Sequence, residues 1–104
     1  SMADSDSLFR VVKSAADADG NNTVDMAGIT KMVADLYPNK GLAEISVIAE
    51  NLMTNIGITE HMLKEGLQPA ELLDAVMDYR GSDPILIDVC NQLAAKSAVL
   101  KWGK

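Results

Sequence analysis

One polar stretch near the start of the chain carries oxygen-bearing side chains at alternate positions. Asp17, Asp19 and Asn21 stand two residues apart, and Asp25 follows four residues after Asn21, on the same alternation. Calcium and magnesium are hard cations that bind oxygen, and alternate residues of a tight loop can direct several oxygens at one centre. The spacing therefore predicts a candidate divalent-cation site built from these four side chains.

The stretch Asp17-Ala-Asp-Gly-Asn-Asn-Thr-Val-Asp-Met-Ala-Gly28 and the apolar residues after it resemble the loop and exiting helix of a calmodulin-type EF-hand. The four side chains match loop positions 1, 3, 5 and 9 of that family. The resemblance implies that Thr23, at position 7, supplies its backbone carbonyl to the ion. It also implies that Val24, at position 8, pairs with a partner loop.

Three residues depart from the family pattern. Gly28 stands where the family has a bidentate Glu, which removes two coordinating oxygens and one negative charge. Asn22 replaces the glycine of the sharp turn, and asparagine tolerates positive φ. Lys13 lies in the entering helix where an apolar residue is expected. We therefore expect weak binding of Ca²⁺ or Mg²⁺, with two alternatives: an inherited but inactive loop, and an unrelated polar turn.

A second resemblance covers some of the same residues. The run Ala15-Ala-Asp-Ala-Asp-Gly20 after an apolar helix is similar to the start of tellurite-resistance TerB-like helical domains, which implies a compact, acidic, all-helical protein. A candidate partner loop, Asp78 to Ile85, has Arg80 at its third position, which would place a cation in the site. We predict that this second segment is only a turn.

Residues suited to catalysis are few. His61 is the only histidine, Cys90 is the only cysteine, and neither has a recognisable catalytic partner in the sequence. We predict that His61 faces solvent and that Cys90 is a small core residue. Glycine-rich phosphate loops and paired-carboxylate motifs are absent from the sequence, so no enzymatic activity is expected.

Composition restricts the class of partner. Nine basic and fifteen acidic side chains give a net charge of −6, and the basic residues are spread along the chain. Nucleic acid and anionic membrane surfaces would be repelled, so neither is an expected partner. No signal sequence or membrane span is recognised, so we expect a cytoplasmic protein. Ser1-Met2 resembles a tag remnant followed by a start Met, and residues 3–104 are expected to form one domain.

Apolar residues at helical spacing predict an all-α domain of five to six helices, with an EF-hand-like helix-loop-helix near the N-terminus. Proline, glycine and capping residues set the expected boundaries. The expected helices run from Leu8 to Ala16 after capping candidates Asp4 to Asp6, Met26 to Leu36, Leu42 to Ile56, Thr59 to Gly66, Pro69 to Tyr79 and Pro84 to Val99.

The sequence favours a small acidic binding or regulatory module whose partner is another protein. Met26, Met32 and Met53 either line a groove for that partner or fill the core, since methionine surfaces adapt to varied targets. The alternative is a metal-independent interaction domain or the subunit of a homo-oligomer.

Overall fold

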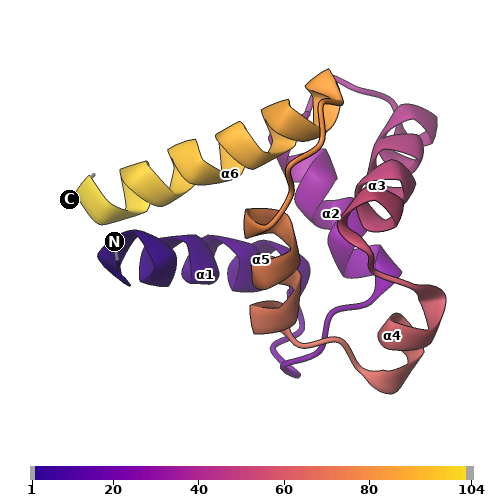
Figure 1. Cartoon of the computed structure of the whole chain (residues 1–104), viewed down its shortest axis with the longest axis horizontal. Coiled ribbons are helices and arrows are strands. Elements are labelled where there is room, and N and C mark those ends of the chain that lie inside the picture. The colour runs from indigo at the N-terminus through magenta and orange to yellow at the C-terminus, as the bar shows by residue number, and fades with distance from the viewer. Residues whose placement is uncertain (1, 103–104) are drawn as a thin grey trace.

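Six helices joined by short connections make up the chain (Figure 1). The computed structural model describes the backbone of residues 2–102 and the side chains of residues 6–100 and 102. The helices are α1 (Met2–Ala16), α2 (Met26–Leu36), α3 (Leu42–Ile56), α4 (Glu60–Glu65), α5 (Pro69–Met77) and α6 (Pro84–Trp102). The predicted all-α class is confirmed.

Local chemistry accounts for most of the boundaries. Asp25 caps α2 by accepting a hydrogen bond from the Gly28 amide, and Thr59 caps α4 by accepting one from the Met62 amide. Gly57 ends α3 in the left-handed conformation, with φ of 79°, which only glycine adopts without cost. Pro69 begins α5, where its missing N–H is not needed. These are the signals on which the predicted boundaries rested.

Three boundaries differ from the prediction. Helix α1 begins at Met2, so Asp4 to Asp6 lie inside it; no glycine or proline interrupts this stretch. Helix α5 ends at Met77 instead of Tyr79, whose hydroxyl accepts a hydrogen bond from the Asp83 amide in the following loop. Helix α6 continues past Val99 to Trp102.

The arrangement places α1 at the centre. It packs against α2, α5 and α6, and it runs beside α6 in the opposite direction, so that the two ends of the chain are neighbours (Figure 1). Helix α3 packs on α2, and the short α4 lies at the far end of the molecule from the two termini. Helix α2 is therefore surrounded by α1, α3 and α6.

The core is aliphatic and draws on every helix except α4. Burying one such side chain contributes about 1.5–3 kcal/mol, and these contacts are what hold the short helices together. Its most deeply buried large side chains are Val12, Val24, Ile29, Met32, Val33, Ile45, Leu52, Leu67, Leu72, Leu86, Val89 and Leu93. None of the described helices is both long and apolar enough to cross a membrane.

Candidate functional site

The loop between α1 and α2 is shaped by two residues with positive φ. Gly20 has φ of 70° and Asn22 has φ of 64°, so asparagine takes the conformation that the family gives to a glycine. The Gly20 amide donates to the Asp17 carbonyl at 3.1 Å, which closes the first turn of the loop. These bends fold the polar side chains of the loop back on one another.

Asp17 is the one candidate ligand that is buried, with 5% of its surface exposed. Its Oδ2 accepts hydrogen bonds from the Asn22 amide at 2.9 Å and from Lys13 Nζ at 3.0 Å. Its Oδ1 is buried and has no hydrogen-bond partner. Because a buried acceptor without a partner is costly, this oxygen marks where a further donor or cation would stabilise the loop.

Lys13 places an ammonium group in the loop. Its Nζ is 3.0 Å from Asp17 Oδ2 and 3.3 Å from Asn22 Oδ1, so one cation bridges the first and sixth residues of the loop. Burial raises the pKa of Asp17, but the hydrogen bonds from Lys13 and the Asn22 amide outweigh that effect and leave the pKa below its usual value. Asp17 is thus held as a carboxylate by an internal counter-ion.

The other predicted ligands make hydrogen bonds within the loop. Asp19 Oδ1 accepts from the Asn21 amide at 3.4 Å, and Asn21 Oδ1 accepts from the amide and hydroxyl of Thr23 at 2.9 and 2.7 Å. Asp25 Oδ1 caps α2 at 2.8 Å from the Gly28 amide. Within the described part of the chain, no three His, Cys, Asp or Glu side chains are grouped so that they could hold a metal ion.

Gly28, in the first turn of α2, lies against the backbone at the end of α1. A Cβ at this position would stand 2.0 Å from the carbonyl oxygen of Ala16, the last residue of α1. That oxygen belongs to the backbone, so it cannot move aside as the end of a side chain could. The packing of the two helices therefore excludes the glutamate that the EF-hand family has at this position.

Val24 pairs with a segment that was not predicted. Its amide donates to the Leu67 carbonyl at 2.7 Å, forming an isolated antiparallel bridge with the connection between α4 and α5. Of the segment Asp78 to Ile85, predicted to be only a turn, residues 78–83 form no helix or bridge, and the last two residues begin α6. The bridge thus links two helix-loop-helix units, α1 with α2 and α4 with α5, and α1 also packs against α5.

The sequence analysis did not identify two residues that hold the loop in place, Lys13 and Leu67. Lys13 was noted only as a departure from the family, although its spacing of four residues from Asp17 is the spacing of a helical ion pair. Leu67 gives no comparable signal, because its pairing depends on how distant segments pack. His61 is exposed as predicted, and Cys90 is half-buried against the core.

No protein-family model, curated protein or solved structure matches this chain. The two resemblances drawn from the loop therefore stay predictions.

Replacing Gly28 tests the close approach of α1 and α2. Replacing an ordinary glycine inside a helix by alanine raises the free energy of unfolding by about 0.5–1 kcal/mol. Here we expect Gly28→Ala to lower the free energy of unfolding by about 1–3 kcal/mol, because its Cβ meets the Ala16 carbonyl. Urea unfolding measures the sign. We expect Gly28→Glu to be destabilised as well, without gaining tight calcium binding; a stabilised Gly28→Ala variant would show that the helices do not meet as described.

Acid unfolding tests the Asp17 carboxylate. The pKa of Asp17 is lower in the folded protein than its ordinary value of 3.8. The ionised carboxylate therefore stabilises the folded protein, and this stabilisation is fully present above the ordinary pKa. The contribution is lost as pH falls through the lower, folded pKa. We expect Asp17→Asn to be less stable near neutral pH and to show a flatter loss of stability below about pH 4. Asp74→Asn, which removes an exposed carboxylate on α5, serves as the control and should keep the wild-type profile.

Proposed function

We propose that this chain is a metal-independent protein-binding module whose partner presents an apolar and basic segment. The observation that carries the proposal is a groove of about 680 Å³ between α2, α3 and α4. Met26 and Met53 line it together with Ile58 and Leu63. Met32, the third methionine of the groove hypothesis, does not line this groove and is fully buried in the core. Flexible methionine side chains let an apolar surface adapt to a partner.

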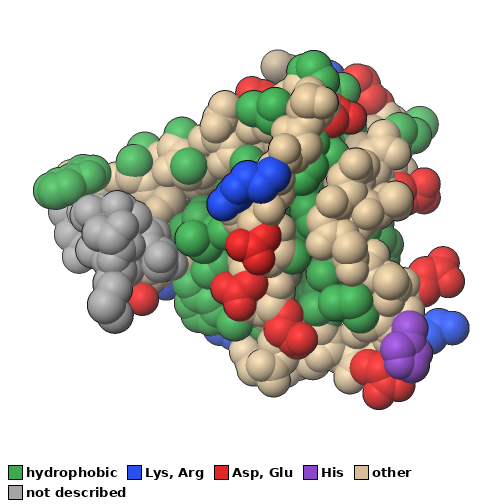
Figure 2. All heavy atoms as spheres, viewed as in Figure 1, with side chains coloured by type: hydrophobic (Ala, Val, Ile, Leu, Met, Phe, Trp, Pro, Cys, Tyr) green, Lys and Arg blue, Asp and Glu red, His purple; other side chains and the backbone are tan. Residues whose placement is uncertain are grey.

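The charge around this groove favours a basic partner. Glu50 and Glu60 lie on its lining and are exposed, and no basic residue is among the described residues that line it. Acidic side chains also outnumber basic ones on the face that carries α4 and α5 (Figure 2). With a net charge of −6, the chain attracts cationic segments, whereas a second copy of the same chain would be repelled.

The loop supports the metal-independent form of this proposal. Lys13 neutralises Asp17 from within the chain, and the remaining candidate ligands are engaged in hydrogen bonds to the loop. Met26 follows the loop directly, in the first turn of α2, so a loop that is stable on its own also holds the groove ready. We keep the cytoplasm as the expected compartment, since one cysteine cannot form a disulfide framework within the chain.

A second candidate function is weak binding of Ca²⁺ or Mg²⁺ in the loop. The buried, unpartnered Oδ1 of Asp17 favours it, because a cation or a cation-bound water would satisfy this oxygen. Such an ion would have to compete with the ammonium group of Lys13 and would lack a ligand at Gly28. The first proposal is preferred because the loop already contains its own cation.

A model peptide tests the groove. A helical peptide of leucine and lysine should bind and shift the methyl NMR signals of Met26 and Met53, and an excess of chelator should leave its affinity unchanged. The same peptide with glutamate for lysine should not bind. Glu50→Gln should weaken binding about threefold, as expected for an exposed charge pair, and more than Asp74→Asn, a matched loss of charge outside the groove.

Two results would overturn the proposal. Equal effects of Glu50→Gln and Asp74→Asn would mean that the peptide responds only to overall charge. Binding that disappears with chelator would mean that an ion controls the module.

An ion titration of wild type and Lys13→Gln separates the two functions. We expect no saturable shift of the amide signals of Gly20 and residues 22–25 in wild type at millimolar Ca²⁺ or Mg²⁺. If the cation function is the true one, wild type shifts saturably, and Lys13→Gln tightens binding by about tenfold because a competing positive charge has gone.

A further inference from the structure

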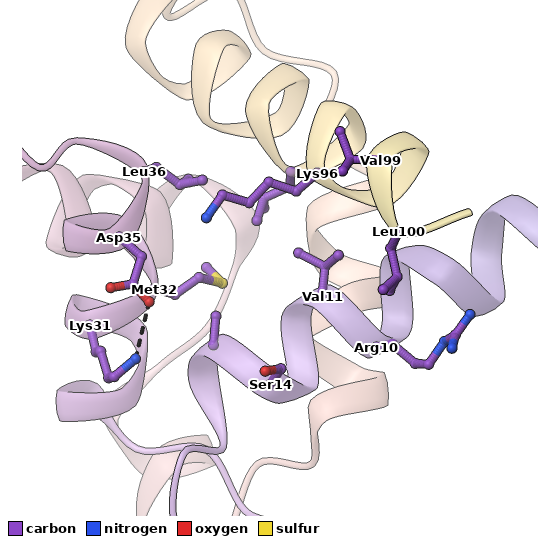
Figure 3. Close-up of a pocket in the computed structure, with 12 residues that line it drawn as sticks. Arg10, Val11, Ser14, Lys31, Met32, Asp35, Leu36, Lys96, Val99 and Leu100 are labelled. Carbon is purple, nitrogen blue, oxygen red and sulfur yellow. Dashed lines mark hydrogen bonds and ion pairs between the residues drawn. The ribbon is translucent and has the colours of Figure 1, made fainter. Parts of the chain in front are cut away.

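A second groove, of about 470 Å³, lies between α1, α2 and α6, and its charge is opposite to that of the methionine-lined groove. Val11 of α1 and Met32 of α2 point into it, and Val99 and Leu100 of α6 form its outer end (Figure 3). Its volume falls within the range of about 300–1,000 Å³ that is usual for sites of small molecules. The proposed protein partner makes no use of this groove.

The apolar lining continues beyond the groove along α6. Val99 is 69% exposed and Trp102, one helical turn further, is 77% exposed. Exposed apolar side chains in one place are typical of a surface that contacts something apolar. A ligand with a hydrocarbon chain would therefore find contacts both inside the groove and along the end of α6.

Three of the nine basic residues of the chain, Arg10, Lys31 and Lys96, line this groove in an otherwise acidic protein. Lys31 is paired with Asp35 at 3.0 Å. Lys96 reaches from α6 across the groove toward α2, whereas Arg10 lies at its outer edge (Figure 3). No described carboxylate lies within ion-pair distance of Lys96 Nζ. Among the described residues, this exposed cation thus has no acidic partner and lies beside the apolar side chains of the groove.

We infer that this groove binds a single-chain amphiphilic carboxylate, a fatty acid of medium length, with its hydrocarbon chain on the apolar floor and its carboxylate at Lys96. A monoanion fits better than a phosphate dianion, because Asp35 also lines the groove. A small ligand also fits better than an acidic peptide. An acidic peptide would extend beyond the basic residues of the groove and would be repelled by the rest of a chain with net charge −6. A small ligand stays within the groove, where the nearby basic residues attract it.

The test uses decanoate as the probe, below its critical micelle concentration, and decanol as its uncharged counterpart. Trp102 is the only tryptophan, so its fluorescence reports on the end of the groove, and amide NMR locates the binding. We expect saturable decanoate binding with shifts at Val11, Met32 and Leu100, and weaker binding of decanol. Lys96→Gln should weaken decanoate binding about threefold to tenfold, while Lys64→Gln, an equal change of charge on α4, should not.

A second variant addresses the apolar part of the site. Val99→Asp places a negative charge on an exposed position of the wall, so the fold should be retained while decanoate binding is lost. The inference is overturned if decanoate gives no saturable shift, or if decanol binds as tightly and Lys96→Gln changes nothing. It is also overturned if a leucine and glutamate peptide occupies the groove and decanoate does not.

These outcomes are independent of the proposed protein partner. Weaker peptide binding by Glu50→Gln with unchanged decanoate binding separates the two grooves, and the reverse holds for Lys96→Gln. A failure of one function therefore leaves the other standing.

Discussion

The close contact between the end of α1 and the first turn of α2 is the constraint on which the rest of the structure depends. The Ala16 carbonyl lies where a Cβ of residue 28 would be, so these helices can meet in this way only because residue 28 is glycine. Asp17, the residue after Ala16, lies buried next to this contact and pairs with Lys13 one helical turn before it. The backbone of α1 thus leaves no room at position 28 for the glutamate that a calmodulin-type EF-hand would have there.

An internal ion pair holds the loop between α1 and α2. The Lys13 ammonium contacts Asp17 and Asn22, and the bridge from Val24 to Leu67 ties the loop to the second helix-loop-helix. Both contacts are built from residues of the chain, so they form as part of folding and need no ligand. The two helix-loop-helix units are in this way held together by contacts within the chain.

The helices could be predicted because their signals are local: an apolar stripe at helical spacing in α3, Thr59 as a cap and Gly57 as a terminator. The features that were missed depend on distant contacts. Leu67 is apolar like its neighbours, and nothing in its surroundings in the sequence shows that its carbonyl pairs with Val24. The end of α5 depends on Tyr79 bonding into the next loop. The candidate ligands were visible from their spacing, but their hydrogen bonds and the role of Lys13 required the fold.

Helix α2 contributes residues to both grooves. Because both of its ends are held by contacts with the rest of the chain, we expect ligand binding in one groove not to affect the other. Met26, in the first turn of α2, lines the acidic groove, whereas Met32 lines the basic one. The first turn is held by the Asp25 cap and the contact at Gly28, and the other end by the hydrogen bond from Tyr37, at its C-cap, to Asp88 of α6. A ligand in one groove could influence the other only by shifting a helix that is anchored at both ends. Because packed backbone resists such shifts, we expect the two proposed ligands to bind without coupling.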